Sequence, residues 1–404
     1  MVPNRWDVRP LADIALITSG GTPSRTKPEF WQNGTIPWIR TTEVQNCILT
    51  PDDVQEYISE EGLKGSSAKL VPSGTVLLAM IGQGKTRGQV ALLRFESTIN
   101  QNCAAIIFNN DQEPYFHFNF LLSQYETIRS MSNSAGQSNL SGALVKTIKV
   151  PVPPLAEQKK IAKILSVWDK AITITEKLLA NSQQQKKALM QQLITGNRRF
   201  PEFKGRWEKR ALSEICILGA GQPAPQEEKY FIDGNHDFLR VSDLGSNTCR
   251  WAPQSRDKVN QSAIRECKLG VVPARATLFT KSGASLLLNQ RAQLKENSFI
   301  VSHLGFAKAK DGVSDDFVFY LMCSIDFNRY AAGTSLPALQ LSVLKSLKVL
   351  VPPYEEQKKI ASMFSDADVE ISILEKKLFL LKKEKKALMQ QLLTGKRRVK
   401  VDAA

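Results

Sequence analysis

The feature that most constrains this chain is a long stretch that occurs twice. The sequence of residues 152–199 is repeated in residues 351–398, at a constant offset of 199 and without a gap. Within them, residues 186–193 are repeated letter for letter as residues 385–392. A repeat of this length indicates a tandem duplication, so we expect a molecule, and a function, in two halves.

Each copy has the spacing of one long helix. Apolar residues recur alternately every four and three residues, which is the pattern of a coiled-coil seam. Prolines precede each predicted helix, and Gly196 and Gly395 follow it where a C-terminal cap belongs. We therefore predict two helices of roughly 60 Å that pair with each other, rather than two ordinary core helices. The predicted helix-pairing and subunit-interface residues are Ile161, Leu165, Trp168, Ile172, Leu179, Leu189 and Leu193 in the first copy, and Ile360, Phe364, Ile371, Leu378, Leu388 and Leu392 in the second.

Two details of the seam are open to test. Trp168 and Leu189 are expected to be buried between the helices. Lys186 and Lys385 occupy matching seam positions where apolar residues would pack better. We interpret these lysines as snorkelling at the edge of the seam or as helping to fix its register.

Two globular segments, the first module (residues 1–150) and the second module (residues 201–350), accompany the helical segments 151–200 and 351–404. The modules repeat each other only weakly. Trp6 and Trp207 match at an offset of 201, and Arg40 and Arg240 each follow an aromatic and an aliphatic residue. Two helical segments that are near-copies, combined with diverged modules, predict a helical scaffold of one geometry that carries two modules with different binding roles.

Within the first module the pattern predicts several elements. Apolar runs of buried-strand length cover residues 75–81, 89–95 and 103–108, and residues 116–130 have helical spacing. Residues 79–86 fit a loose phosphate-loop pattern. A strand-like run follows them, whereas a nucleotide loop requires a helix there, so we do not expect nucleotide hydrolysis.

Composition narrows the function further. The chain carries 54 basic and 39 acidic residues, a formal charge of +15, and most of the excess lies on the two helical segments. Such a balance favours nucleic acid or an acidic protein as the partner. We expect a cytoplasmic protein without membrane contact, since no apolar run could span a bilayer and the start lacks a signal peptide. The six cysteines and three histidines are scattered, which argues against a metal site.

One motif similar to a catalytic sequence lacks its functional side chain. Residues 351–354 read Val-Pro-Pro-Tyr, whereas amino-methyltransferases have Asn or Asp first, to accept a hydrogen bond from the target amine. Valine cannot accept that bond, and the sister copy, residues 152–155, reads Val-Pro-Pro-Leu. We therefore do not expect this chain to methylate anything by itself.

The chain resembles the specificity subunit of type I restriction–modification enzymes over essentially its whole length. The resemblance rests on the duplicated Val-Pro…Glu-Gln-Lys-Lys-Ile helices and on the stretch at residues 19–38, Ser-Gly-Gly-Thr-Pro-Ser-Arg…Phe-Trp…Ile-Pro-Trp. It implies an α+β fold in which two globular α/β-mixed target-recognition domains are joined by two long helices forming an antiparallel coiled coil. The second module departs from the 19–38 pattern at residues 219–223.

The resemblance also implies a role. The family reads a bipartite double-stranded DNA target, with one half-site for each recognition domain and the helices as the ruler between them. The subunit is non-catalytic and holds no cofactor of its own. It docks two methyltransferase subunits, and nuclease/translocase subunits complete a restriction enzyme. ATP, Mg²⁺ and S-adenosylmethionine belong to those partners.

Basic residues in the modules are the candidate DNA contacts, because arginine can grip guanine or phosphate and lysine is mostly a phosphate anchor. We favour Arg40 and Arg240, since the apolar pair before each could fix its direction. Two other functions stay open, a coiled-coil scaffold without a DNA role and a stand-alone DNA-binding regulator. The full candidate set is Arg25, Lys27, Arg40, Lys85, Arg87, Arg240, Lys281 and Arg291.

Overall fold

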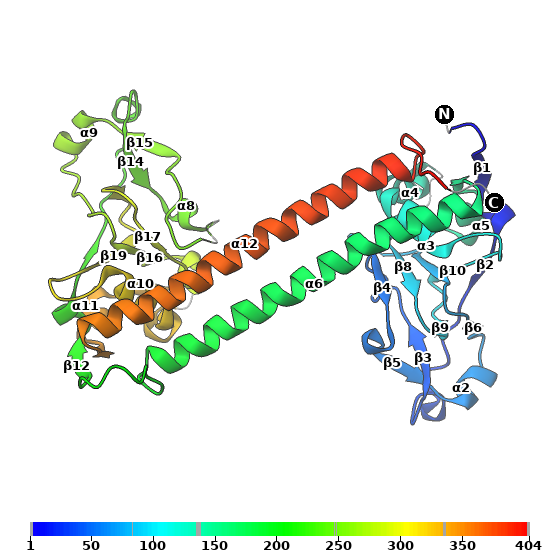
Figure 1. Ribbon diagram of the computed structural model, residues 1–404, viewed down its shortest axis with the longest axis horizontal. Coiled ribbons are helices and arrows are strands. Elements are labelled where there is room, and N and C mark those ends of the chain that lie inside the picture. Colours follow the sequence, from blue (N-terminus) through cyan, green and yellow to red (C-terminus); the bar gives the residue numbers. More distant parts are fainter. Residues whose placement is uncertain are drawn as a thin grey trace. The chain divides into compact units, whose positions relative to one another are not determined.

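The chain divides into two compact units (Figure 1). Unit 1 consists of Met1–Ile174 with Phe379–Ala404, and unit 2 of Thr175–Leu378. Each unit thus combines one module with a part of both long helices. The computed structural model describes residues 3–82, 84–134 (without the side chains of 133 and 134), 139–245, 247, 249–333 and 337–401.

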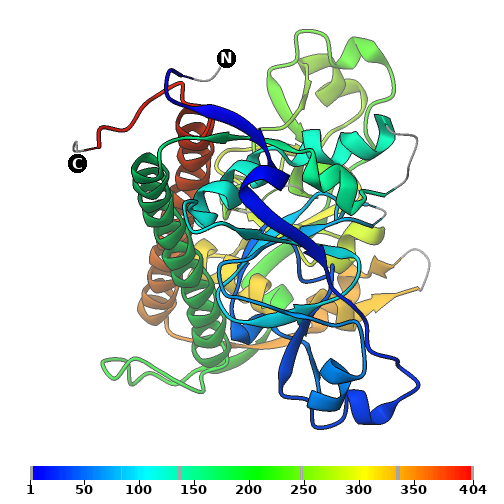
Figure 2. The same ribbon diagram turned by 90° about the vertical axis from the view of Figure 1, so that its right-hand side faces the viewer.

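The first module, which begins with the blue ribbon in Figure 2, is built on two sheets. Five strands lie in the order β2-β10-β7-β8-β4, and four in the order β5-β3-β9-β6. A separate ladder joins β1 (Asp7–Pro10) to β11 (Lys149–Val152), directly before the first long helix. The strands of the two sheets are β2 (Ala15–Ser19), β3 (Ile36–Ile39), β4 (Cys47–Leu49), β5 (Glu56–Ile58), β6 (Leu70–Val71), β7 (Val76–Ala79), β8 (Val90–Leu93), β9 (Ser97–Ile99) and β10 (Cys103–Phe108).

Strands β7, β8 and β10 confirm the three buried runs expected from the sequence. The helix expected over residues 116–130 is instead two helices, α3 (Pro114–Ser123) and α4 (Tyr125–Ser134). The N–H of Gln124 donates to both the Phe120 and the Leu121 carbonyl, so the last turn of α3 tightens and ends. The shorter helices are α1 (Leu11–Ile14), η1 (Pro28–Phe30), η2 (Pro51–Asp53), α2 (Glu60–Lys64) and α5 (Gly142–Lys146).

The second module repeats this plan. Its sheets have the orders β13-β19-β16-β17 and β15-β14-β18, and β12 (Glu208–Ala211) pairs with β22 (Lys348–Val351) before the second long helix. In both modules the central strand of the smaller sheet has one antiparallel and one parallel neighbour. The sheet strands are β13 (Cys216–Ala220), β14 (His236–Leu239), β15 (Asp257–Val259), β16 (Thr277–Thr280), β17 (Arg291–Gln293), β18 (Phe299–Ile300) and β19 (Leu304–Ala309).

The remaining elements of the second module are short apart from α10. Helix α10 corresponds to α3, because the main-chain N–H before each helix donates to the glutamine of the repeated Glu-Gln-Lys-Lys motif. The elements are α7 (Leu212–Ile215), η3 (Glu228–Tyr230), α8 (Val241–Gly245), α9 (Gln261–Glu266), η4 (Ala284–Leu288), α10 (Asp315–Ser324), η5 (Phe327–Tyr330), α11 (Leu341–Ser346) and the ladder of β20 (Ala331–Ala332) with β21 (Ala338–Leu339).

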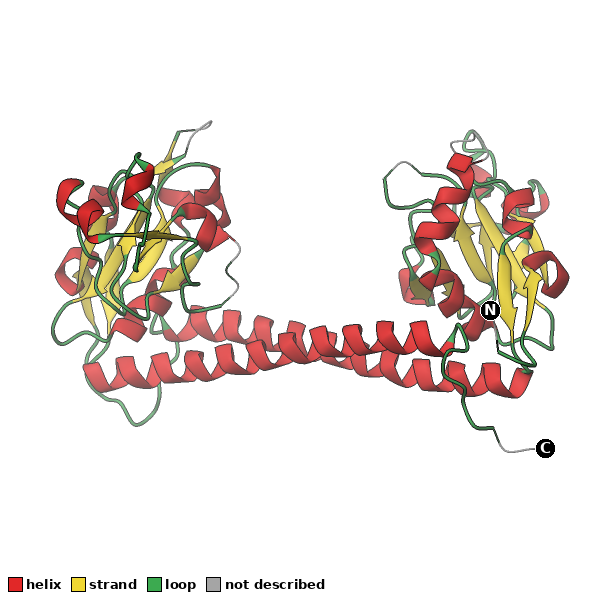
Figure 3. Cartoon of the chain, turned by 90° about the horizontal axis from the view of Figure 1, so that it is seen from above, coloured by secondary structure: helices red, strands yellow, loops and turns green. Residues whose placement is uncertain are grey.

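The two long helices, α6 (Leu155–Leu193) and α12 (Tyr354–Leu392), are each unbroken over 39 residues (Figure 3). Both begin directly after a Pro-Pro pair, where a missing N–H costs nothing. After each helix, Gly196 and Gly395 have a φ of +73°, which confirms the predicted glycine caps.

Within unit 1 the two long helices run antiparallel. Asp169 of α6 pairs with Lys385 of α12, with 2.5 Å between Oδ1 and Nζ. Toward the start of α6, Ile161 and Leu165 share a core cluster with Leu392, near the end of α12. Residue numbers therefore fall along one helix as they rise along the other.

Unit 2 repeats the arrangement with the helix ends exchanged. Lys186 of α6 pairs with Asp368 of α12. Ser182, four residues earlier, donates to Glu370 at 3.1 Å. The antiparallel pairing is thus present in each unit, and each seam lysine has a carboxylate of the other helix as its partner.

Among the seam residues named from the sequence, those near the helix ends, where the modules also pack, are fully buried. Two helices alone cover one side of a side chain, so residues farther along keep some exposure. Trp168 and Leu189 are therefore partly rather than fully buried, contrary to expectation. The buried seam residues are Ile161, Leu165, Leu193, Ile360, Phe364 and Leu392. The partly buried ones are Trp168, Ile172, Leu179, Leu189, Ile371, Leu378 and Leu388.

Candidate nucleic-acid interface

The two arginines favoured by the sequence occupy equivalent places. Arg40 follows β3, and Arg240 follows β14, the matching strand of the second module. The two apolar residues before each arginine are buried at 3% exposure or less. The direction of each arginine is therefore set by a buried strand end, as the sequence suggested.

Two carboxylates hold Arg40. Glu43 accepts the main-chain N–H of Arg40 at 3.0 Å, and its other oxygen accepts from the guanidinium at 2.8 Å. Glu56, on β5, lies 2.6 Å from Nη1. The hydrogen bond to Glu43, together with the charges of both carboxylates, raises the pKa of Arg40. The side chain is charged and held in one direction.

Arg240 has the same arrangement. Asp243 accepts its main-chain N–H at 2.8 Å, and Asp257 of β15 pairs with its Nε. Asp257 faces Phe238 in the β14–β15 ladder, as Glu56 faces Trp38 in the β3–β5 ladder. The two modules thus share an arginine held by two carboxylates, one three residues later and one on the next strand.

The surroundings of the two arginines differ in charge. In the second module a cavity of about 370 Å³ is lined by Arg240, Arg256, Asp257, Lys258 and Phe231. Arg256 is itself positioned by Asp243, at 2.9 Å. In the first module a cavity of about 520 Å³ has polar and acidic lining instead, from Arg40, Thr42, Glu43, Gln45, Asp53 and Gln55, with Cys47 and Leu49.

Arg256 and Lys258 were not among the residues predicted from the sequence. Aligning the modules at an offset of 201 would have signalled Arg256, because the first module has Gln55 there. The comparison would have shown a charge present in one module and absent from the other.

Arg25 joins the cluster around Arg40. Its guanidinium pairs with Glu56 at 2.5 Å and stacks 3.5 Å from the ring centroid of Trp31. Glu56 therefore contacts both arginines. Lys27 lies farther along the same loop, 4.8 Å from the ring centroid of Phe30.

Lys85 and Arg87 lie in a separate loop between β7 and β8. Lys85 is exposed and Arg87 is half-buried. The hydroxyl of Tyr125 donates to the Lys85 carbonyl at 2.6 Å, which fixes the loop to α4. The loop leads through turns into β8, as expected, and not into the helix that a phosphate loop requires. Of the phosphate-loop stretch, Gln83 lies outside the described residues.

The two remaining candidates of the second module differ from each other. Lys281 is half-buried at the end of β16. Arg291 directs four N–H groups at protein acceptors: the carbonyls of Met322, Gln290 and Ile325 and the side chain of Asn289. Burial lowers its pKa to about 10. These contacts give Arg291 a structural role, so we leave it out of the proposed DNA-contacting set.

Both modules match one family model, which describes a type I restriction modification DNA specificity domain, over residues 3–181 and 204–383. The chain belongs to this family. It is 28% identical to the type I restriction enzyme MjaIX specificity subunit of Methanocaldococcus jannaschii, over 98% of this chain and 95% of that protein. It is 25% identical to the EcoprrI specificity subunit of Escherichia coli, over 89% and 86%.

A solved structure shares the fold. The type I restriction–modification S subunit from M. genitalium matches with a TM-score of 0.63 at 14% identity, over 97% of this chain and 98% of that chain. Among the described residues of the present specificity chain, no helix is long and apolar enough to cross a membrane. Nor do three or more His, Cys, Asp or Glu side chains gather there as a metal site would require.

The repeated motifs of this specificity chain fasten each module to the long helices. In unit 2, buried Glu356 accepts from Nε and Nη2 of Arg199, at 3.0 and 2.6 Å. It also accepts from Nε1 of Trp207 at 3.0 Å. An ideal Cβ on Gly196 would lie 3.2 Å from the Trp207 ring, so the capping glycine also leaves room for the indole.

Unit 1 has the same junction. Glu157 accepts from Nε of Arg398 at 3.0 Å and from Nε1 of Trp6 at 3.2 Å. Glu-Gln-Lys-Lys, Thr-Gly-x-Arg-Arg and the leading tryptophan are thus parts of one contact. This shared junction accounts for the recurrence of these motifs at both ends of the two helical copies.

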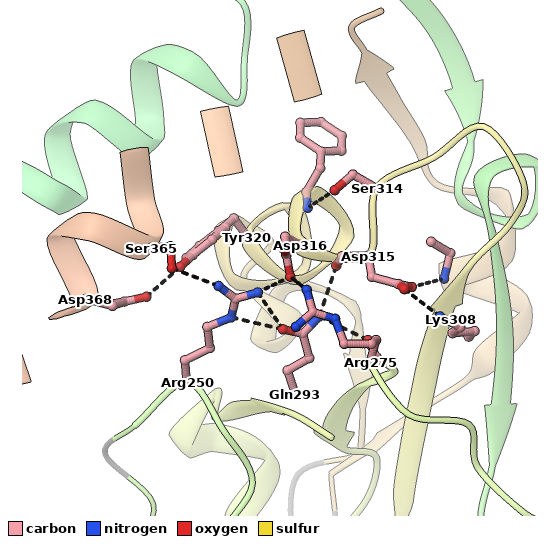
Figure 4. Close-up of polar contacts among 12 residues, drawn as sticks. Arg250, Arg275, Gln293, Lys308, Ser314, Asp315, Asp316, Tyr320, Ser365 and Asp368 are labelled. Carbon is pink, nitrogen blue, oxygen red and sulfur yellow. Dashed lines mark hydrogen bonds and ion pairs between the residues drawn. The ribbon is translucent and has the colours of Figure 1, made fainter. Parts of the chain in front are cut away.

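The second module of this specificity chain adds a polar network at its contact with α12 (Figure 4). Asp316 of α10 pairs with both Arg250 and Arg275. Arg250 also donates to Gln293 at 2.7 Å and to Ser365 of α12 at 3.2 Å. The first module has Leu49, Gly74, Leu92 and Tyr115 at the positions of Arg250, Arg275, Gln293 and Asp316, by the offset of 201.

Proposed function

We propose that this chain is the DNA-reading subunit of a type I restriction–modification enzyme, in which residues 1–150 and residues 201–350 are target-recognition domains for the two halves of a split target. The observation that carries the proposal is the shared arginine with its two carboxylates. The same frame holds Arg40 and Arg240, while the residues around them differ in charge. Two arginines that are fixed in the same way but have differently charged neighbours suit two modules that read different bases.

The proposed contacts combine base and phosphate roles. Arg40 and Arg240 are the candidates for base edges, because each is directed by fixed partners. The others are candidates for phosphate, and the charge of +15 favours such binding. The proposed set is Arg25, Lys27, Arg40, Lys85 and Arg87 in the first module and Arg240, Lys281 and Arg256 in the second.

The partners follow from the family. The chain would direct two methyltransferase subunits, and nuclease/translocase subunits where these exist, and would perform no catalysis itself. ATP, Mg²⁺ and S-adenosylmethionine would bind to those partner subunits. Exposed apolar residues on the long helices support docking there, because they recur at helical spacing on one face and grouped apolar side chains mark a protein contact. They include Val167 and Ile174 in unit 1 and Val369 and Ile373 in unit 2.

The decisive experiment is co-expression with the cognate methyltransferase, followed by mapping of the methylated adenines. We expect a motif of two short half-sites with an unspecific gap. Replacing residues 1–150 by the domain of another family member should change one half-site only. A change in both halves would refute independent reading. No methylation and no DNA affinity with the partner bound would favour a scaffold, and tight specific binding without a partner would favour a stand-alone regulator.

The ruler role of the helices has a separate test. Seven residues inserted at equivalent positions of α6 and α12 lengthen the pair by about 10 Å, which is roughly three base pairs. We expect the gap between the half-sites to grow by that amount while the bases read remain the same. An unchanged gap would refute the ruler.

A further inference from the structure

The second module exposes two neighbouring leucines at a place where the first module carries cations. Leu287 and Leu288 belong to η4, and their exposed fractions are 56% and 62%. Leu286, one residue earlier, is fully buried in the core of unit 2. The corresponding loop of the first module, between β7 and β8, carries Lys85 and Arg87 instead.

Hydrogen bonds hold this leucine turn firmly. Asn289, which follows η4 in the left-handed region with a φ of +56°, donates to Asp326 at 2.9 Å and accepts from the N–H of Phe327 at 3.1 Å. Asn328 donates to the Leu287 carbonyl at 3.3 Å. An apolar tip that is already ordered loses little conformational entropy when it contacts a partner.

The neighbours of the turn suit DNA better than a protein surface. Gln290 donates at 3.0 Å to the carbonyl of Gly245, in the helix that directly follows Arg240. Arg329, whose side chain is 79% exposed, is next to Asn328 in the chain, and Lys281 precedes the turn. The leucine turn thus adjoins the helix that follows the proposed base-reading arginine, with cations nearby that could contact phosphates.

We propose that Leu287 and Leu288 form an apolar wedge that enters the base stack at the half-site read by the second module. The inference rests on the proposed function. Proteins that distort DNA insert leucine and similar side chains between base steps while cations contact the flanking phosphates. The first module would approach its half-site through the cations of the same loop. The two half-sites would then differ in deformation as well as in sequence.

The test uses the chain bound to its methyltransferase subunits and a duplex with the mapped target. 2-Aminopurine, whose fluorescence rises on unstacking, replaces single bases of the second half-site other than the methylated adenine. We expect a rise with the wild type and none with Leu287→Ser/Leu288→Ser. The same variant should weaken target binding about tenfold, because the burial lost by two leucine side chains outweighs the unstacking cost that the variant avoids. The slope of affinity against salt should stay unchanged, since leucine releases no counterions.

Two matched variants complete the test. Leu287→Met/Leu288→Met should keep both signals, and Ile232→Ser, at a residue of the same module that is 58% exposed, should change neither. Equal affinity and fluorescence for the serine variant would overturn the wedge. So would a serine variant that loses methyltransferase binding in the absence of DNA, because the leucines would then be a protein contact. A wild-type complex without specific DNA binding would instead refute the proposed function itself.

Discussion

The hydroxyl of Tyr320 donates to Asp368 at 2.8 Å, and thereby ties helix α10 of the second module to α12. Tyr115 makes the same contact with Asp169 in unit 1. The two aspartates correspond at the repeat offset, but the tyrosines do not, since Asn119 is the position that matches Tyr320. A tyrosine one helical turn away therefore reaches the equivalent carboxylate. Burial and the neighbouring carboxylate raise the pKa of both tyrosines, so both hydroxyls remain donors.

The ion pair of Lys186 with Asp368 fixes the register of the helices in unit 2. We expect Lys186→Asp to lower the free energy of unfolding by about 2 kcal/mol, because two carboxylates would meet in a partly buried place. Adding Asp368→Lys should recover part of the loss, although the new lysine cannot accept from Tyr320. Urea unfolding measures both. Equal recovery when Asp368→Lys is combined with Lys385→Asp would contradict the pairing.

Lys186→Leu should likewise lower stability, by about 1 kcal/mol, since Asp368 loses its cation. Seam position alone predicts that leucine at both lysine positions would raise stability, because apolar residues pack better there. The carboxylate partner reverses that expectation. A higher unfolding midpoint for this variant would show that apolar packing outweighs the ion pair at this position.

Glu356 is the centre of the junction in unit 2, and its side chain is fully buried. Glu356→Gln should lower the free energy of unfolding by about 3 kcal/mol, because the charge of Arg199 loses its partner. Glu355→Gln, at an exposed neighbour, is the matched control and should have little effect. Hydrogen exchange locates the damage, and faster exchange confined to residues of unit 1 would contradict the assignment.

The two kinds of proposed DNA contact separate in a titration against salt. Lys85→Ala should weaken binding similarly for correct and altered sites and reduce the salt slope by about one unit. Arg40→Ala should cost about 1–3 kcal/mol on the correct site and far less on a site changed at the base it reads. The methyltransferase-bound chain is titrated with both DNAs. Equal losses on both sites would make Arg40 a phosphate contact.

His117 makes the stability of unit 1 depend on pH. Burial lowers its pKa to about 3, from about 6.5 when unfolded. The unfolded chain therefore binds more protons between these values, and stability falls as the pH decreases from about 6.5 toward 3. His117→Gln should reduce this loss, measured as the shift in unfolding midpoint between pH 7.5 and 5.5. An identical shift in the variant would rule out His117 as the source.

The long helices and the direction of Arg40 could be predicted from sequence, because both depend on local patterns. The apolar periodicity predicts the long helices, and the buried apolar pair at the end of a strand predicts the direction of the arginine that follows it. The partners of Arg40 were harder, since Glu56 comes from another strand and only the β3–β5 register brings it near. The internal partners of Arg291 could not be predicted, because most of its acceptors are main-chain carbonyls, which every residue carries.

Divergence between the modules also concealed contacts. The Tyr115 and Tyr320 hydroxyls reach equivalent aspartates from different positions, so alignment at a fixed offset does not find them. The break at Gln124 escaped prediction because the apolar spacing continues through it. What could be predicted is local or repeated, and the rest depends on tertiary pairing.

Unit 1 contains the first module, yet it also needs residues 379–404, which the ribosome makes after all of unit 2. Thr175–Leu378 is complete before the Arg398 that binds Glu157 exists. Because domains generally fold as units during synthesis, unit 2 has all its residues first, and the first module lacks the Arg398–Glu157 contact until the residues that follow α12 have been made. The half of the molecule that is begun first is finished last.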